Sequence, residues 1–276
     1  MGILHLVATP IGNLEDISAR ALRILREARL IAAEDTRHTR QLLTHFEIHT
    51  PLTSYYEHNK LAKLDSILAA LGGGDVALVS DAGMPAINDP GYELVRAALA
   101  AGHTVSPVPG PSAPIAALAA SGLPTDAFLY LGYLPRKSGE RRALLQSVAP
   151  LPYTLIFLET PHRLLDALDD LLAVLGERPL AAARELTKLH EEIARGTIGE
   201  VQTHFRNKEP RGEFTLVVGG KIEQSQDGGQ WTEEQLLTAI RAGLKSQQPA
   251  KELALALVGP SGWPKREIYN LINRSK

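Results

Sequence analysis

Short, continuously apolar runs alternate with longer amphipathic stretches through the first part of the chain. The apolar runs cover residues 4–8, 30–33, 76–79 and 103–108. The stretches that follow them carry apolar residues at roughly helical spacing and cover residues 15–28, 61–71, 92–101 and 112–120. Strands that are apolar on both faces are typical of a parallel sheet with helices on both sides. The pattern therefore predicts an α/β domain with a parallel sheet.

A second series of elements begins after Gly122-Leu123-Pro124, where we place a domain boundary. Strands are predicted at residues 128–131, 154–158, 180–183, 193–196 and 214–218, and helices at 141–148 and 162–175. Because the last strands follow one another closely, we expect a mixed sheet. Polar residues 223–230 indicate a linker, and the tail predicts three short helices. The predicted organisation is two α/β domains, residues 1–122 and 123–222, followed by a small helical module, residues 231–276.

Bulk properties exclude several classes of protein. The chain has 276 residues, a length suited to two domains, and 44% of them are hydrophobic. It has no cysteine, which rules out disulfides, thiolate metal sites and a cysteine nucleophile. We see no signal peptide and no apolar run long enough to span a bilayer, so we expect a cytoplasmic protein without a membrane partner. The net charge of -2 argues against a simple RNA-binding protein.

Three loops rich in glycine and proline follow predicted strands, at residues 9–13, 80–91 and 107–113. Open α/β sheets bind ligands at the carboxyl ends of their strands, and such residues let a ligand approach the main chain. Any one loop is equally well an ordinary turn, whereas three on one edge favour a cofactor site. The G-x-G-x-x-G fingerprint and the P-loop are both absent, which disfavours nicotinamide and nucleoside triphosphate ligands. S-adenosylmethionine needs no phosphate cradle and fits this description.

Six motifs carry a specific resemblance. They are Thr9-Pro10-Ile11-Gly12-Asn13-Leu14, Ala33-Glu34-Asp35-Thr36-Arg37, Ser80-Asp81-Ala82-Gly83, Asn88-Asp89-Pro90-Gly91, Pro109-Gly110-Pro111 and Ala183-Arg184-Glu185-Leu186-Thr187-Lys188. With these motifs the chain resembles the tetrapyrrole-methylase superfamily over residues 1 to about 220. Within that superfamily it resembles the branch that methylates ribosomal RNA rather than the porphyrin enzymes. Met84 departs from the resemblance, which has threonine at this position.

The resemblance implies a fold, an activity and a cofactor site. It implies a homodimer with a cofactor cleft between two α/β domains of tetrapyrrole-methylase type. The implied activity is the S-adenosyl-L-methionine-dependent 2′-O-methylation of a cytidine ribose in 16S rRNA of the small ribosomal subunit. The implied cofactor residues of the first domain are Pro10, Ile11, Gly12, Asp81, Ala82, Gly83, Met84, Ser112 and Ala113. Those of the second domain are Leu158, Ala183 and Thr215.

Ionisable side chains cluster directly after the second predicted strand, in Glu34-Asp35-Thr36-Arg37-His38. One interpretation is a helix cap at Asp35 or Thr36 with a charged first turn. The other is catalytic: Glu34 or Asp35 removes the proton of a ribose hydroxyl, and Arg37 holds the neighbouring phosphate. Glu185 and Lys188 are rival candidates. In-line positioning of the hydroxyl and the methyl group is a further source of rate.

Two basic segments are candidates for RNA contacts. The first is the densest positive run, with Arg136, Lys137, Arg141 and Arg142; it is equally well a solvated loop and helix start. The second is residues 231–276, with seven Lys and Arg against four Glu, a net charge of +3. There Lys265 and Arg266 follow a proline at a predicted helix start, in a module that either docks on RNA or packs on the dimer.

The histidines do not indicate a metal centre. His45 and His49 are four residues apart, but the H-E-x-x-H pattern is absent and no third ligand is evident. We therefore expect no catalytic metal.

Two other functions compete with RNA methylation. One is a methyltransferase of the same superfamily that acts on a tetrapyrrole or another small molecule. The other is a non-catalytic RNA-binding protein. The acidic segment after the second strand and the basic segments argue against the first, and the near-neutral charge argues against the second.

Overall fold

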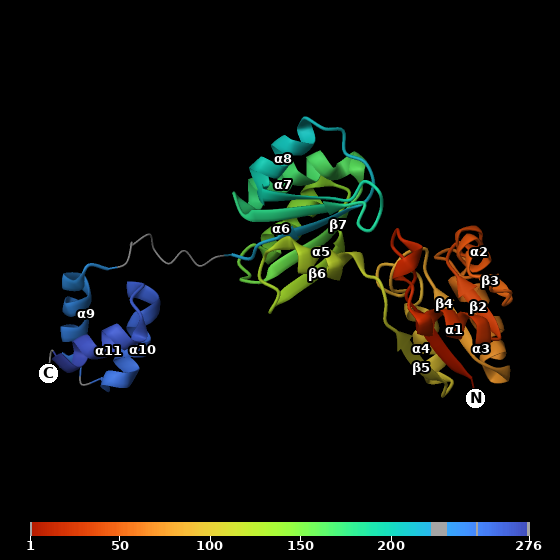
Figure 1. Ribbon diagram of the computed structural model, residues 1–276, viewed down its shortest axis with the longest axis horizontal. Helices are drawn as coiled ribbons and strands as arrows, with labels where there is room; N and C mark the ends of the chain where they lie inside the picture. The colour runs from red at the N-terminus through yellow and green to blue at the C-terminus, as the bar shows by residue number, and fades with distance from the viewer. Residues whose placement is uncertain (1, 222–230, 247, 275–276) are drawn as a thin grey trace. The chain divides into compact units, whose positions relative to one another are not determined.

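A computed structural model of the chain describes residues 2–221, 231–246 and 248–274 (Figure 1). The chain forms two compact units, Met1–Gly220 and Lys221–Lys276. The predicted linker at residues 223–230 lies outside the described residues.

The first sheet has five parallel strands in the order β3-β2-β4-β1-β5. Their bounds are β1 Ile3–Val7, β2 Leu30–Ala33, β3 Leu52–Ser54, β4 Val76–Val79 and β5 Thr104–Val108. All four residues of β4 are buried because helices cover both faces of the sheet. The parallel sheet that the sequence predicts is confirmed. The short edge strand β3 is not predicted, since its three residues are only half-buried and carry no clear apolar pattern.

Four helices cover this sheet. Apolar side chains of α1 Ala19–Glu27 and α2 Thr36–His45 pack on one face, and those of α3 Lys60–Gly73 and α4 Tyr92–Ala100 pack on the other. Local signals set the helix bounds. The hydroxyl of Ser18 accepts a hydrogen bond from the amide of Ala21 and starts α1, after the 3-10 turn Leu14–Asp16. The glycines after Leu71 end α3 as predicted.

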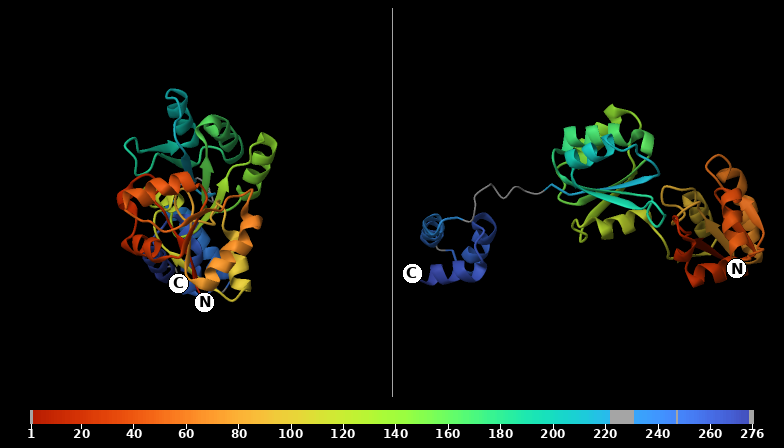
Figure 2. Two further views of the ribbon diagram at one scale, coloured as in Figure 1. Left: turned by 90° about the vertical axis from the view of Figure 1, so that its right-hand side faces the viewer. Right: turned by 45° about the horizontal axis from the view of Figure 1, so that its top comes forward.

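The second sheet is mixed, with the order β6-β7-β10-β8-β9. Its strands are β6 Phe128–Tyr133, β7 Thr154–Glu159, β8 Pro179–Arg184, β9 Glu192–Thr197 and β10 Phe214–Val218. Only β6 and β7 pair in parallel; the other neighbours are antiparallel. The predicted mixed sheet is confirmed. Its helices are α6 Ser138–Val148, α7 Leu164–Leu175 and α8 Ile198–Arg206, with the 3-10 turn Pro161–Arg163 before α7. They cover one face of the sheet (Figures 1 and 2).

Helix α5 Ala113–Ser121 covers the other face of the second sheet. Its Ala117 and Leu118 pack against Ile156, Ala181 and Val217. The predicted boundary at residue 122 is therefore corrected, because packing assigns α5 to the second sheet. Gly122 has a φ of 80° and ends the helix in the left-handed conformation that glycine adopts readily. The glycine-proline signal marks a helix end, not the limit of a core.

The described residues of the second unit form three helices, as the tail sequence predicts. These are α9 Glu233–Lys245, α10 Ala250–Ser261 and α11 Lys265–Arg274. Leu236 and Ile240 of α9 form a small core with Leu253, Ile268 and Ile272. The indole of Trp263 donates a hydrogen bond of 2.6 Å to the carbonyl of Trp231, which ties the α10–α11 turn to the start of the unit. None of the described helices is long and apolar enough to cross a membrane.

Candidate active site

The three glycine- and proline-rich loops meet at the carboxyl edge of the first sheet. Thr9 and Gly83 exchange backbone hydrogen bonds of 2.9 and 3.0 Å, which join the loop after β1 to the loop after β4. The third loop lies equally close, since a Cβ atom on Gly110 would stand 2.9 Å from Cβ of Ala8. Gly83 itself has a φ of 79°, which favours glycine at this junction.

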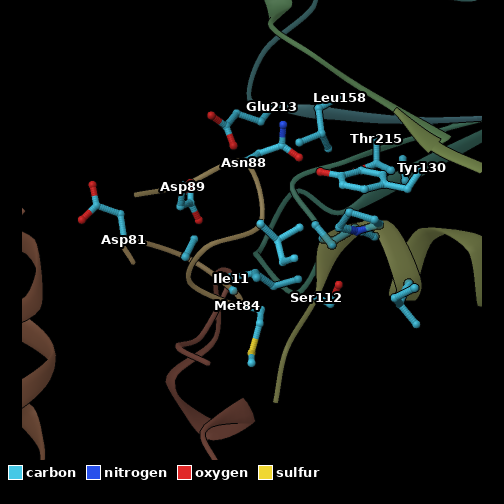
Figure 3. A pocket seen from close by; sticks show the side chains of 18 of the residues that line it. Ile11, Asp81, Met84, Asn88, Asp89, Ser112, Tyr130, Leu158, Glu213 and Thr215 are labelled. Carbon is cyan, nitrogen blue, oxygen red and sulfur yellow. The ribbon is translucent and has the colours of Figure 1, made fainter. Parts of the chain in front are cut away.

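These loops form one wall of a cleft of about 870 Å³, and the ends of β7, β8 and β10 form the facing wall (Figure 3). A cleft of this size lies in the range of roughly 300–1,000 Å³ that holds small ligands. Of the twelve predicted cofactor residues, ten line it. They are Ile11, Asp81, Ala82, Gly83, Met84, Ser112, Ala113, Leu158, Ala183 and Thr215. Pro10 and Gly12 do not line the cleft.

Strained backbone concentrates in two loops that line the cleft. Among the described residues, five that are not glycine have positive φ, and four of them are Ala86, Asn88, Glu185 and Thr187. Ala86 and Asn88 belong to the loop after β4, and Glu185 and Thr187 to the loop after β8. Each such residue costs on the order of 1–3 kcal/mol and persists where the surroundings impose it, often at ligand sites.

Acidic side chains occupy one part of the cleft. Glu34, Asp81, Asp89 and Glu213 line this part, whereas Glu185 lines the cleft from the loop after β8, paired with Lys188. Figure 3 shows Asp81, Asp89 and Glu213 together on one side of the view, with Ile11 and Met84 apart from them. The cleft therefore has an apolar part and an acidic part, an arrangement suited to a ligand with a flat apolar group and positive charge.

Glu34 and Asp81 are fixed by main-chain amides. The amide of Asp81 donates to Oε2 of Glu34 over 3.4 Å, and the amide of Asp35 donates to Oδ1 of Asp81 over 3.1 Å. Burial, together with the negative charge of Asp89, raises the pKa of Glu34 to about 6. Burial also raises the pKa of Asp89 to about 6, with contributions from the charges of Asp81 and Glu213. The acidic part is thus electrostatically strained when no cation is near.

Asp35 and Arg37 do not line the cleft. Oδ1 of Asp35 accepts a hydrogen bond of 2.8 Å from the amide of Arg37, so Asp35 is the N-cap of α2. Its carboxylate also accepts two bonds from the Arg37 guanidinium, which hold the pKa of Asp35 well below its ordinary value. The Arg37 side chain is 89% exposed. The geometry separates the three predicted residues: Glu34 faces the cleft, whereas Asp35 and Arg37 face solvent.

The rival candidates Glu185 and Lys188 both line the cleft. They form an ion pair with 2.9 Å between Nζ of Lys188 and Oε1 of Glu185. This pair lies on the facing wall, in the loop after β8, so it is available to a group that enters between the walls. Because its ammonium already donates to Glu185, Lys188 is suited to hold an anionic group rather than to remove a proton.

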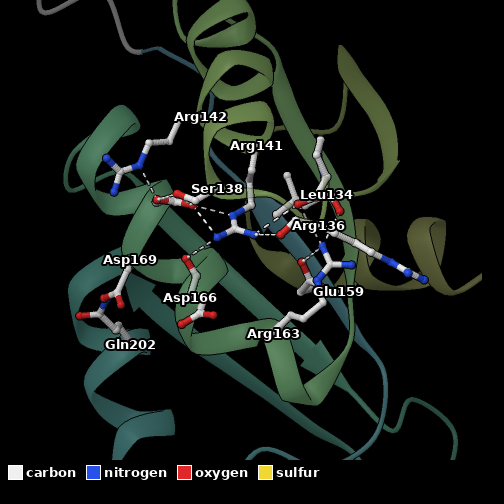
Figure 4. Close-up of polar contacts among 12 residues, drawn as sticks. Leu134, Arg136, Ser138, Arg141, Arg142, Glu159, Arg163, Asp166, Asp169 and Gln202 are labelled. Carbon is white, nitrogen blue, oxygen red and sulfur yellow. Dashed lines mark hydrogen bonds and ion pairs between the residues drawn. The ribbon is translucent and has the colours of Figure 1, made fainter.

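The residues predicted to contact RNA differ in their exposure to solvent. Arg136, Lys137, Lys265 and Arg266 are exposed. Arg141 is only 4% exposed, and its guanidinium lies 2.6 Å from Oδ2 of Asp170 (Figure 4). It also donates to the carbonyls of Pro135, Arg136 and Asp166.

Arg141 is therefore corrected from an RNA contact to a buried ion-pair residue that fixes the loop before α6. The adjacent Arg142 pairs with the same Asp170 but keeps about half of its side chain exposed.

Tyr130, Tyr133 and Glu213 are among the lining residues that the sequence analysis did not single out. Burial raises the pKa of Tyr130 to about 12, and so does burial of Tyr133, assisted by the charge of Glu213. The hydroxyl of Tyr133 lies 3.3 Å from Oε1 of Glu213. Aromatic residues on an edge strand are the sequence signal for the two tyrosines, and no signal points to Glu213. Among the described residues, no cluster of three or more His, Asp and Glu side chains is placed to hold a metal ion.

A family model described as Tetrapyrrole (Corrin/Porphyrin) Methylases matches residues 3–202 of the chain. The chain belongs to the tetrapyrrole methylase family. This match covers the first sheet and all strands of the second sheet except β10, but not the three-helix unit. Membership in the tetrapyrrole methylase family makes the chain a methyltransferase.

Its relatives among tetrapyrrole methylases cover nearly the whole chain. A protein of Halalkalibacterium halodurans named ribosomal RNA small subunit methyltransferase I is 48% identical, over 99% of this chain and 95% of its own length. A protein of Escherichia coli O157:H7 with the same name is 47% identical, over 97% of this chain and 93% of its own. Both alignments therefore extend into the three-helix unit.

Solved structures of other tetrapyrrole methylases share the fold at low identity. Cobalt precorrin-4 methyltransferase is 18% identical with a TM-score of 0.59, and covers 79% of this chain and 94% of its own. Uroporphyrin-III C-methyltransferase from Thermus thermophilus, complexed with S-adenyl homocysteine, is 22% identical with a TM-score of 0.54. That match covers 79% of this chain and 97% of the other. These likenesses extend to the fold alone.

Proposed function

We propose that this chain transfers a methyl group from S-adenosyl-L-methionine to the 2′-hydroxyl of a cytidine in 16S rRNA of the small ribosomal subunit. The relatives named as small-subunit rRNA methyltransferases support the substrate class, since their alignments cover almost the full chain. The observation that carries the proposal is the division of one cleft into an apolar part and an acidic part.

The residues of the cleft fit this methyl donor. Its adenosine suits the apolar part around Ile11, Met84 and Leu158, where few polar groups are needed. Its sulfonium and ammonium groups are cations, and they offset the burial and the mutual repulsion that raise the pKa of Glu34 and Asp89. When bound, the donor supplies an activated methyl group on sulfur.

Glu34 is the residue we assign as the general base. It lines the cleft, unlike Asp35, whose carboxylate is already used by Arg37 and the helix cap. With a pKa of about 6, Glu34 is ionised at neutral pH and yet more basic than an ordinary carboxylate, which suits proton removal from a ribose hydroxyl. Glu34 would take the proton as the hydroxyl oxygen bonds to the methyl carbon, while the bond from that carbon to the donor's sulfur breaks and the demethylated donor leaves.

Cations outside the acidic part hold the RNA in this proposal. Arg37 is exposed at the start of α2, and Lys188 lies on the facing wall of the cleft, so both can donate hydrogen bonds to a phosphate. Arg136, Lys137 and the exposed part of Arg142 form a second basic area, and Lys265 with Arg266 a third. The homodimer remains a prediction, which light scattering of the full chain tests.

Labelled S-adenosylmethionine tests the function directly. The protein is incubated with small ribosomal subunits that lack the modification and, in a parallel reaction, with uroporphyrinogen. We expect label in 16S rRNA, on the ribose of a cytidine after nuclease digestion and nucleotide mapping. Label in the pigment would support a small-molecule methylase instead. If the donor binds but label reaches neither substrate, the proposed RNA methylation is not supported and only the fold assignment stands.

A further inference from the structure

A groove runs along the outer face of α2. It is lined by Thr36, Arg37, Arg40, Gln41, Thr44 and His45. These positions follow the spacing of one helix face, while Thr39, Leu42 and Leu43 on the opposite face are buried. The groove is separate from the cleft, because the two share no lining residue.

The charge of this face has one sign. Residues Thr36–His45 contain two arginines, two histidines and three threonines, but no acidic residue. Arg37 is held by Asp35 through its guanidinium. Arg40 is exposed, and within the described part of the chain it has no ion-pair or hydrogen-bond partner. A free guanidinium in a groove is a binding group for an anion.

The groove begins next to the acidic part of the cleft. Asp35 caps α2, and the preceding residue, Glu34, faces the cleft beside Asp81. Carboxylates repel phosphate but admit a neutral ribose. An RNA strand that places a ribose against Glu34 must therefore keep its phosphates outside the acidic part. The α2 face offers cations at that border and extends about 12 Å along the helix from residue 37 to residue 45.

We propose that the outer face of α2 binds the sugar–phosphate backbone of the RNA beside the methylated nucleotide, with Arg40 as a phosphate contact. The proposal rests on the function proposed above. The length of the face exceeds the ~3.4 Å axial separation of successive phosphates on one strand, so it accommodates more than one phosphate. The carboxylates of the cleft and the cations of α2 thus position the strand: the sugar enters the cleft, and the phosphates remain on α2.

Arg40→Ala is the variant that tests this proposal, with Arg40→Lys to retain the charge. Arg96→Ala on α4 is the matched control, because Arg96 is also exposed on a helix of the first sheet. The probe is the unmethylated small ribosomal subunit, bound over a series of salt concentrations. We expect Arg40→Ala to weaken binding about two- to fivefold at low salt, the size of one exposed charge contact. The slope of log affinity against log salt should fall by roughly 0.7–0.9.

Kinetics separate binding from a general loss of structure. Arg40→Ala should raise KM for the subunit by the same factor, with kcat and S-adenosylmethionine affinity as in the parent chain. Arg40→Lys should keep the parent's salt slope. If Arg40→Ala keeps the slope and KM of Arg96→Ala while the parent methylates the subunit, the α2 proposal is overturned. If the parent methylates no subunit at all, the proposed function fails, and a normal slope for Arg40→Ala then rejects the α2 face as well.

Discussion

Gly12, in the loop after β1, lies directly against Lys188, in the loop after β8. A Cβ atom on Gly12 would stand 2.5 Å from Cγ of Lys188, 2.8 Å from Oγ1 of Thr187 and 2.9 Å from the carbonyl oxygen of Leu186. The last of these is main chain and cannot rotate away. The loops that form the two walls of the cleft therefore meet at a position where a side chain does not fit, although Gly12 itself does not line the cleft.

Gly12→Ala should weaken S-adenosylmethionine binding. The added methyl group must push the loop after β8 away from the loop after β1, and such overpacking costs about 1–3 kcal/mol. We expect roughly a tenfold or larger loss of affinity by calorimetry. The control is Gly139→Ala in α6, where a Cβ atom meets nothing within 4 Å. Equal affinities for the two variants would show that the contact at Gly12 does not hold the walls of the cleft.

Glu34→Gln should abolish most methylation while the methyl donor still binds. An amide keeps the shape of the side chain but cannot accept a proton, and the loss of a general base costs about 10²–10⁴ in rate. Asp35→Asn should cost far less, because Asp35 faces Arg37 rather than the cleft. Rates of label transfer to small ribosomal subunits measure both variants. An inactive Asp35→Asn beside an active Glu34→Gln would reverse the assignment.

The rate should also report the pKa of Glu34. Because that pKa is raised to about 6 by burial and the base must be ionised, kcat/KM for the RNA should fall on the acidic side of pH 6. At saturating methyl donor the limb reports the enzyme–donor complex. Because the donor's cations lower the pKa of Glu34, the limb should lie between the ordinary value of 4.5 and the ligand-free value of about 6. A rate that stays flat down to pH 4.5 would exclude Glu34 as the base.

Folding stability should fall as pH rises through 6 in the ligand-free protein. Glu34 and Asp89 have folded pKa values of about 6, above their ordinary values of 4.5 and 3.8. A raised folded pKa means that the folded state binds protons more tightly, so this contribution is fully present below the ordinary pKa and is lost above pH 6. Tm measured from pH 4 to 7.5 tests it. The variant with Glu34→Gln and Asp89→Asn should lose this pH dependence, and an unchanged profile would argue against it.

Arg141→Ala should destabilise the protein rather than weaken RNA binding. Asp170 is buried and would keep only Arg142 and Ser138 as partners. Removal of one partner from a buried ion pair costs about 3–5 kcal/mol. Urea unfolding measures the loss. Arg136→Ala, in the exposed loop that Arg141 supports, should leave unfolding unchanged and lower affinity for the small subunit instead. The opposite pattern would return Arg141 to the RNA surface.

Removal of Lys221–Lys276 should leave methyl-donor binding intact and weaken association with the small ribosomal subunit. The two units have separate cores, and every residue that lines the cleft lies in Met1–Gly220. The tail carries exposed cations such as Lys265 and Arg266, so the salt dependence of subunit binding should decrease without it. Calorimetry with the donor and salt-dependent binding of the subunit measure the two effects. An unchanged salt slope would assign the tail another role.

The sequence by itself determined the features that depend on local chain properties. The strand at residues 76–79 is apolar throughout because both of its faces are covered, and α3 ends at glycines that leave the helix easily. Glycine and proline likewise marked the three loops, since unusual backbone paths need those residues. The run of charged residues after β2 was also visible in the sequence, because it interrupts an apolar pattern.

Tertiary structure alone decided which charged side chain faces which partner. Arg141 and Arg142 are neighbours in one basic run and both pair with Asp170 of α7, yet the Arg141 side chain is buried and that of Arg142 is half-exposed. Glu34 and Asp35 are separated in the same way by the cap of α2. Tyr130 of β6 and Glu213, directly before β10, both line the cleft although they lie more than 80 residues apart in the sequence. Local periodicity carries no information on such long-range contacts, since they depend on how two sheets and their loops pack together.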